Sequence, residues 1–548
     1  MKKYLDDVRA LIKSRAYCFC VFAIALISFG YAAFNTSISV DDMEYDRYVG
    51  SGNEMLAAGR FGIWFWSFIE GKWENSYLID IFAVFMFVFA CINFCVLFKR
   101  VSKGKIGIGA LTVFSCLFIS YPLMNEIWEY TGANVNICGS YLLVSFSLLI
   151  IHSFIHSEKT KKDYLSLVGV APMMTLVCAG YESVVPVYIF FVFAILALQI
   201  IYGEEKEKKF LEILKQGLIY AGFLVVGLIL RLIIHTLVLL ICNIPYAPNG
   251  STKILWGVTP ISSIIKSFAV SWGVYWFLRA LIYMPLAILI ISAITLIIMG
   301  IAAAKKHSYL ILLMGAGMFL SLIILPIVQG APAAYRTCQV FAPFCAFTGM
   351  MFVSCFPKGE RKSKNILRIC ALTLCGFLCF YQASYLNYFL ELNHRRSESE
   401  EAVIRQVSYD LRSGFDENKP VIFVGSHTLS PTITEAASAP ENSLRWKLYA
   451  KIYHTLSSMT GGESNSSELY RKLPTTNINS VINWSLTAFN SQDSMPKLFS
   501  YFGCDYIPAD FDTYFDVATE YAEEENMPAY PQKGYIKDMG DYIIVHMQ

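Results

Sequence analysis

The chain has 548 residues, of which 55% are hydrophobic and only 16% are charged, and its formal net charge is +2. Soluble domains carry about 25% charged residues, so this composition indicates a membrane protein. The small net charge supplies no overall field for nucleic acid, and we expect no nucleic-acid partner. The fifteen cysteines lie mostly inside apolar runs, where they are typical of small buried side chains and not of a disulfide framework.

Eleven apolar stretches are long enough to cross a membrane as helices. They are residues 17–34, 78–98, 106–123, 137–157, 164–180, 184–202, 212–242, 281–303, 308–328, 338–356 and 365–386. We therefore expect an α-helical polytopic membrane protein with about eleven transmembrane helices. The first stretch resembles a signal peptide, but it is long enough to span and no small-residue cleavage site precedes the following charged loop, so we predict a retained helix.

Basic residues predict the orientation of these helices. Lysine and arginine clusters precede the first stretch and follow the second, fourth, sixth, eighth and tenth stretches. If each stretch crosses once, every cluster falls on the same side, and cytoplasmic loops are the ones enriched in basic residues. We predict a cytoplasmic N-terminus and an extracytoplasmic C-terminal segment.

The region 257–280 is also apolar, but it contains two basic residues and two tryptophans, Trp272 and Trp276. A crossing here would place the basic residues 305–306 outside. We therefore predict an interfacial or re-entrant helix on the outer face, anchored by the tryptophans.

Residues 387–548 are more polar than the rest of the chain, and we predict that they form a small extracytoplasmic α/β domain after a transmembrane domain of residues 1–386. "SESEEAVIRQVSYDLRS" (397–413) has helical spacing of apolar residues. "KPVIFVG" (419–425), "CDYI" (504–507) and "GYIKDMGDYIIVHMQ" (534–548) have the pattern of strands and a hairpin. We expect this domain either to recognise an acceptor substrate of the membrane domain or to cover the functional site of that domain.

The first outer loop, residues 35–77, begins with a dense group of charges, "DDMEYDR" at 41–47. Three interpretations compete: a solvated loop beside the membrane, a cation site, and a catalytic carboxylate. Paired carboxylates such as Asp41 and Asp42 suit magnesium, manganese or calcium. They also suit general-base catalysis, and we favour a base that takes a proton from an acceptor hydroxyl.

Three arginines, Arg47, Arg60 and Arg336, lie near span ends on the outer side, where the orienting rule does not require them. The planar guanidinium binds phosphate oxygens in pairs. We predict that Arg60 and Arg336 neutralise a departing phosphate, and that Arg47 either joins them or pairs with Asp46.

Acidic residues recur in the later outer loops. Glu126 and Glu129 are three apart beside Trp128 and Tyr130, so they either bind a sugar with the aromatic rings stacked on it or belong to a solvated interfacial belt. Glu182, in "GYES", lies close to the hydrocarbon boundary, where an acidic side chain is costly and suggests function.

The stretch "DDMEYDRYVGSGNEMLAAGRFGIW" (41–64) resembles the opening of the GtrII-like, phage-type O-antigen glucosyltransferase family of the GT-C class. The "NE" of the next outer loop, "YES" at 181–183 and the "KPVIFVG" strand also fit, although Glu182 stands where the family more commonly has glutamine. The resemblance implies an inverting glycosyltransferase that moves a sugar from a polyprenyl-phosphate donor to a cell-envelope glycan. The family's catalytic aspartate maps to Asp41 or Asp42, and the other one would position the base, bind sugar hydroxyls or hold a cation.

The resemblance also implies a bacterial cytoplasmic (inner) membrane location, O-antigen modification, and partnership with a donor synthase and a flippase. It leaves open whether a divalent cation, magnesium or manganese, is bound at Asp41 and Asp42. A lipid-linked saccharide transporter or flippase, an envelope glycan polymerase or ligase, and a glycan sensor remain alternatives. Transporters usually show internal repeats and ionisable residues at mid-membrane, and a sensor needs a cytoplasmic output domain; the sequence shows neither.

Overall fold

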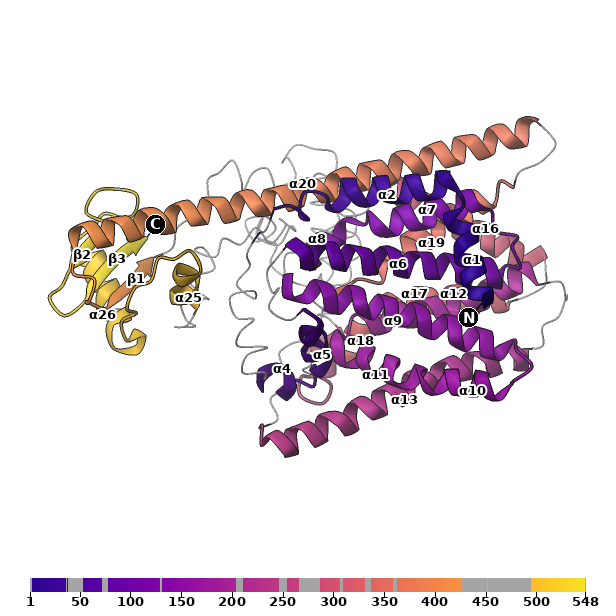
Figure 1. The fold of residues 1–548 in the computed structure, drawn as a ribbon, viewed down its shortest axis with the longest axis horizontal. Coiled ribbons are helices and arrows are strands. Elements are labelled where there is room, and N and C mark those ends of the chain that lie inside the picture. Colours follow the sequence, from indigo (N-terminus) through magenta and orange to yellow (C-terminus); the bar gives the residue numbers. More distant parts are fainter. Residues whose placement is uncertain are drawn as a thin grey trace.

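The computed structural model describes residues 2–35, 37, 53–70, 77–128, 131–203, 210–245, 254–265, 286–305, 309–330, 337–357, 362–425, 451 and 494–547. These residues form a helical bundle and a small three-stranded sheet, joined by one long helix (Figure 1). The predicted tryptophan anchors Trp272 and Trp276 lie outside the described residues. The chain is thus a mostly helical, polytopic membrane protein.

The elements have the following bounds. The helices are α1 (Lys2–Ile12), α2 (Arg15–Phe29), α4 (Asn53–Ala57), α5 (Phe61–Glu70), α6 (Tyr77–Val101), α7 (Ile108–Ile119), the short 3₁₀ helix η3 (Pro122–Met124), α8 (Asn125–Trp128), α9 (Thr131–Ile155), α10 (Lys161–Val168), α11 (Val170–Gly180), α12 (Val184–Tyr202), α13 (Phe210–Cys242), α16 (Leu286–Lys305), α17 (Leu310–Ser321), α18 (Ile324–Gln329), α19 (Phe341–Ser354), α20 (Lys362–Gly414), α25 (Ser494–Tyr501) and α26 (Phe511–Glu524). The strands are β1 (Val421–Gly425), β2 (Ile536–Asp538) and β3 (Ile543–Met547).

Six helical segments of the described part are long and apolar enough to cross a membrane: α6, α9, α10 with α11, α12, α13 and α20. The helices α1 and α2 meet at 77° and count as a seventh if they form one span. The other predicted stretches fall on the shorter apolar helices α7, α16, α17 and α19. Apolar length alone therefore located the helices, while the total of eleven crossings stays a prediction.

The centre of the bundle is formed by helices that are apolar on every side, which is the pattern of a fully buried helix. Phe94 of α6 and Phe191 of α12 stack with ring centroids 3.8 Å apart, and Phe118 from the end of α7 packs against both. The helix α13 differs, because most of its side chains are exposed on the bundle surface.

The helix α20 is continuous over 53 residues, which at 1.5 Å per residue makes it about 80 Å long. It contains both the predicted span 365–386 and the predicted helix 397–413. No proline interrupts it, and glycine occurs only at Gly376 before the final Gly414, so the change of composition near residue 386 produces no break. It runs along the bundle and continues into the sheet-containing unit (Figure 1).

The C-terminal unit is built on the last turns of α20. The strand β3 lies between β1, to which it is parallel, and β2, to which it is antiparallel. Apolar side chains of α20, including Ile404 and Val407, share one core with the sheet and α25. The predicted strand 419–425 and the predicted hairpin 534–548 are confirmed.

The predicted strand "CDYI" (504–507) is wrong. Its side chains pack on β1, with the Tyr506 and Phe423 ring centroids 5.4 Å apart, but the backbone pairing in the described residues is a single isolated bridge between Val421 and Pro508. In this bridge the Val421 N–H donates to the Ile507 carbonyl and the Ala509 N–H donates to the Val421 carbonyl, and no further rung follows.

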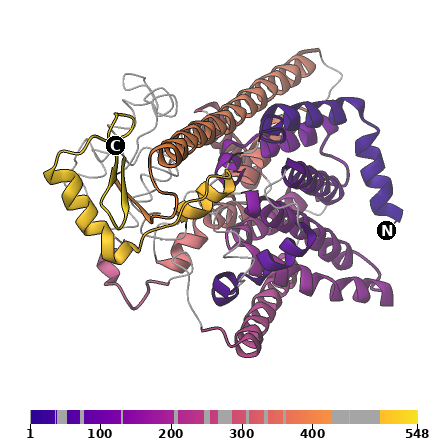
Figure 2. The same cartoon turned by 60° about the vertical axis from the view of Figure 1, so that its left-hand side comes forward.

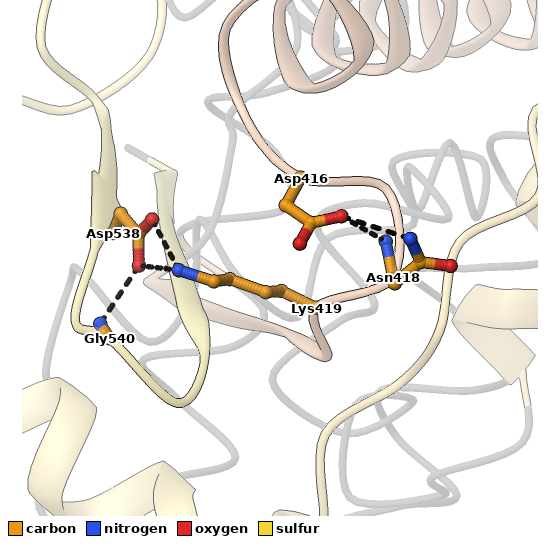
Figure 3. A network of polar contacts seen from close by, with 5 residues as sticks. All are labelled: Asp416, Asn418, Lys419, Asp538 and Gly540. Carbon is orange, nitrogen blue, oxygen red and sulfur yellow. Dashed lines mark hydrogen bonds and ion pairs between the residues drawn. The ribbon is translucent and has the colours of Figure 1, made fainter.

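An ion pair connects two segments at one end of the three-stranded sheet (Figure 3). Lys419 Nζ lies 2.7 and 2.9 Å from the two carboxylate oxygens of Asp538, and the Gly540 N–H donates to the same carboxylate at 2.8 Å. The Lys419 ammonium and then the Gly540 N–H hold the pKa of Asp538 below its usual value. The contact joins the start of β1 to the turn between β2 and β3.

Candidate functional site

The helix α5 lies against the end of the bundle from which α20 continues to the sheet (Figures 1 and 2). Its sequence, "FGIWFWSFIE", has no charge before Glu70. Ile63 and Trp66 are buried against the bundle, whereas Trp64 and Phe68 are exposed. The sequence predicts one outer loop over residues 35–77. The structure instead places an apolar helix of that loop against the transmembrane helices.

Two glycines allow α5 to approach its neighbours closely. A Cβ on Gly139 of α9 would lie 2.3 Å from Trp66 Cζ2. A Cβ on Gly62 of α5 would lie 2.6 Å from the backbone nitrogen of Gly180. Both distances are far shorter than van der Waals contact, so α5 keeps this position only while these residues have no side chain.

We expect Gly139→Ala to displace Trp66 and α5. Overpacking a filled site costs about 1–3 kcal/mol, which exceeds the gain in helix propensity of about 1 kcal/mol. The variant should unfold at a lower temperature than the wild type. The matched control is Gly222→Ala on α13, where nothing lies within 4 Å of the added Cβ. Equal melting temperatures in the two variants would contradict this packing effect.

An ion pair forms where α5 begins. Arg60 precedes α5 and Glu182 lies in the connection from α11 to α12, 122 positions later. Arg60 Nε donates to Glu182 Oε1 at 3.2 Å, and Arg60 Nη2 donates to Oε2 at 3.0 Å. Only 9% of the Arg60 side chain and 22% of the Glu182 side chain are exposed. The Tyr181 ring centroid lies 5.6 Å from the guanidinium carbon. Paired charge-assisted hydrogen bonds of this kind fix both side chains.

The sequence predicts that Arg60 neutralises a phosphate, and it suggests a separate function, substrate binding, for Glu182. In the structure the two residues bind each other, and the Glu182 carboxylate accepts hydrogen bonds from the Nε edge of the Arg60 guanidinium. Any phosphate therefore meets Arg60 as half of a buried ion pair and not as an isolated cation. The substrate role of each residue stays a prediction.

Two residues of α13 that were not predicted from the sequence also bind the turn that precedes α5. Arg231 Nε donates to the Gly59 carbonyl at 3.2 Å, and His235 Nε2 donates to the Ala57 carbonyl at 3.2 Å. Gly59 has φ +75°, a conformation that side chains other than glycine rarely adopt. The available signal was that Arg231 is the one Asp, Glu, Lys or Arg residue in residues 216–242. The expectation that no ionisable residue lies within the spans is therefore wrong for this helix.

Buried polar side chains lie inside the bundle beside Gly180, which contacts α5. Asn134 Nδ2 donates to Asp80 Oδ1 at 2.7 Å, and both residues are buried. A Cβ on Gly180 would lie 2.6 Å from Asn136 Oδ1 and 3.1 Å from Ser140 Oγ. The amide of Asn136 and the Ser140 hydroxyl are fully buried and have no hydrogen-bond partner in the described part of the chain. Buried polar side chains usually have a hydrogen-bond partner, so Asn136 and Ser140 mark a polar region inside the bundle.

The remaining predicted site residues are placed as follows. Glu126 lies on α8. Asp41, Asp42, Asp46, Arg47, Glu129 and Arg336 lie outside the described residues.

The predicted stacking of Trp128 on a sugar is not supported. Trp128 is 3% exposed and packs on Phe29, with ring centroids 4.2 Å apart. Burial against the end of α2 removes its faces from any substrate in this structure.

A divalent cation at Asp41 and Asp42 also stays a prediction. Within the described ranges, no group of three or more His, Cys, Asp or Glu side chains is arranged to hold a metal ion. The two aspartates do not belong to those ranges.

The family model described as Glucosyl transferase GtrII matches residues 30–354, which is more than half of the chain. The match includes the acidic loop, the Arg60–Glu182 ion pair and α13, and it ends before α20. No curated protein and no solved structure gives a significant match. Because a single family model covers most of the helical bundle together with its polar site, the chain belongs to the GtrII glucosyl transferase family.

Proposed function

We propose that this protein transfers a hexose, with glucose as the first candidate, from a polyprenyl-phosphate donor to a cell-envelope glycan. The observation that carries the proposal is the family match over residues 30–354. This range encloses both the carboxylate-rich first loop and the buried ion pair at Arg60 and Glu182. A lipid-linked donor suits the location of that pair, at the end of a bundle whose outer helices expose apolar side chains.

The proposed reaction is one inverting displacement. Asp42 or Asp41 takes the proton of an acceptor hydroxyl, whose oxygen forms a bond to the anomeric carbon of the donor sugar. The bond from that carbon to the phosphate oxygen breaks, and its electron pair leaves with polyprenyl phosphate. The transition state resembles an oxocarbenium ion, as in glycoside hydrolysis, and the neighbouring carboxylates stabilise it.

Cationic residues stabilise the departing phosphate in this proposal. Arg336 contributes one guanidinium, and Arg60 contributes the charge that remains after its pairing with Glu182. Asp46, Arg47, Glu126 and Glu129 bind sugar hydroxyls or position the base. A divalent cation at Asp41 and Asp42 is an additional option and not a required step.

We further propose that the reaction takes place on the outer side of the bacterial inner membrane. The support is the location of the basic clusters, which places the first loop and residues 387–548 outside. The described residues that flank the acidic loop, through Asn35 and from Asn53, belong to the bundle end nearer the C-terminal unit (Figure 1). That unit would then recognise the acceptor glycan, while a donor synthase and a flippase would supply the lipid-linked sugar.

The test is glycan analysis in cells that express or lack the protein. We expect one sugar substituent to disappear from the envelope glycan in its absence, while the polyprenyl-phosphate sugar accumulates. Loss of the substituent without donor accumulation would indicate another donor. A shortened or missing glycan chain would favour a polymerase or ligase, and donor trapped on the cytoplasmic side would favour a flippase.

A further inference from the structure

The helix α13 forms part of the lipid-facing surface of the bundle. Leu228, Leu232 and Ile233 are 42%, 65% and 48% exposed, and Leu240 and Ile241 near its end are more exposed still. Exposed apolar side chains on a spanning helix contact acyl chains. A lipid that approaches α4 and α5 from this side therefore moves along α13.

Arg231 is a charge placed in this apolar surface. Ionised side chains within spans are costly, and they usually pair with an opposite charge or mark a ligand pathway. In the described part of the chain, Arg231 has one hydrogen bond, from Nε to the Gly59 carbonyl, and no carboxylate partner. Arg60, which follows Gly59 in the chain, differs because Glu182 neutralises it.

The two arginines meet at Gly59. A Cβ on Gly59 would lie 3.1 Å from Arg231 Nη2 and 3.1 Å from His235 Nδ1, so both side chains of α13 converge on this residue. Arg60 carries the chain from Gly59 into α5, where it binds Glu182. One turn of backbone thus joins a cation at the lipid-facing surface to the buried ion pair.

We propose that Arg231 binds the phosphate of the isoprenoid-linked donor as it enters from the bilayer, with the isoprenoid chain along the apolar face of α13. This inference rests on the proposed function and assigns its donor phosphate to a residue outside the first loop. The Nε of Arg231 holds the Gly59 carbonyl, while the Nη groups supply the paired donors that suit phosphate oxygens. After transfer, the phosphate changes from a diester with one negative charge to a monoester with a charge of about −1.5 to −2, which a neighbouring cation also stabilises.

The test compares binding of farnesyl phosphate and of farnesol to the full-length protein in nanodiscs. The variants are Arg231→Met, Arg231→Lys and, as a lipid-facing control on the same helix, Leu232→Met. We expect the wild type and Leu232→Met to prefer the phosphate, because a charged hydrogen bond favours it by about ten-fold or more. Arg231→Met should lower this preference several-fold while still binding farnesol, because only the contribution of Arg336 and Arg60 remains, and Arg231→Lys should lower it less.

Each other outcome overturns the inference. Unchanged phosphate preference in Arg231→Met would show that Arg231 does not contact the phosphate, as would a wild type without preference. Equal loss of both ligands in Arg231→Met and Arg231→Lys would show that the arginine only holds the Gly59 turn. The binding assay does not depend on catalysis. A wild type that prefers farnesyl phosphate but transfers no sugar would contradict the proposed function. A wild type that transfers sugar, with an Arg231→Met variant that keeps the preference, would contradict this inference alone.

Discussion

Replacing the base of the first loop with asparagine should lower the rate of sugar transfer by about 10²–10⁴-fold, the usual contribution of a positioned general base. Of Asp41→Asn and Asp42→Asn, we expect this loss in the variant that removes the base and a smaller loss in the other. Asparagine has nearly the same size but cannot accept the acceptor proton. Both variants should therefore reach the membrane in normal amounts. Initial rates in membranes at matched protein levels measure the effect.

The control for this comparison is Asp6→Asn on α1. Asp6 is exposed and pairs with Arg9 at the opposite end of the bundle (Figure 1). It should transfer sugar at the wild-type rate. Wild-type rates in both loop variants would contradict the catalytic assignment of Asp41 and Asp42. The loop would then be a solvated segment or a cation site.

Breaking the Arg60–Glu182 pair should reduce both stability and activity. Removing one partner of a buried ion pair costs about 3–5 kcal/mol, because the other charge stays in the low-dielectric interior. We therefore expect Arg60→Met and Glu182→Ala each to lower the unfolding temperature in detergent. The double variant should be less destabilised than the sum of the two, since the two groups act as a unit. Glu182→Gln should be milder, because the amide oxygen still accepts one hydrogen bond.

A variant of a second ion pair is the control that distinguishes a loss of stability from a loss of catalysis. Arg100 and Asp7 form a comparable contact, with Nε and Oδ2 2.8 Å apart and side chains 15% and 22% exposed. It lies at the opposite end of the bundle, where α1 meets α6. Asp7→Ala should lower the unfolding temperature but leave the transfer rate per folded molecule close to wild type. If Arg60→Met lost no more activity than Asp7→Ala at a similar loss of stability, the Arg60–Glu182 pair would have only a structural role.

The sequence predicted the helices well because apolarity is a local property. Each predicted stretch lies on a helix, and the strands at 419–425 and 534–548 have the period and flanking residues of short strands. The exception, "CDYI", has strand-like residues, but the backbone that follows it pairs with β1 at only one isolated bridge in the described residues.

The site was predicted less completely because its geometry depends on contacts between distant segments. Arg60 was identified because the orienting rule does not require an arginine on the outer side, and Glu182 because an acidic side chain is costly near the hydrocarbon boundary. Nothing in the local sequence shows that they bind each other. The position of α5 depends on the missing side chain of Gly139, which a single sequence does not distinguish from an ordinary helical glycine. Arg231 escaped notice because it belongs to no basic cluster.

The most direct test of the central claim uses the purified full-length protein with its acceptor glycan and two labelled donors of the same sugar. One donor is the polyprenyl-phosphate sugar and the other is the nucleotide sugar. We predict that label moves from the lipid donor to the glycan, with inversion at the anomeric carbon, and that the nucleotide sugar gives no product. Transfer from the nucleotide sugar, or no transfer from the lipid donor under conditions where the protein stays folded, would contradict the proposed reaction.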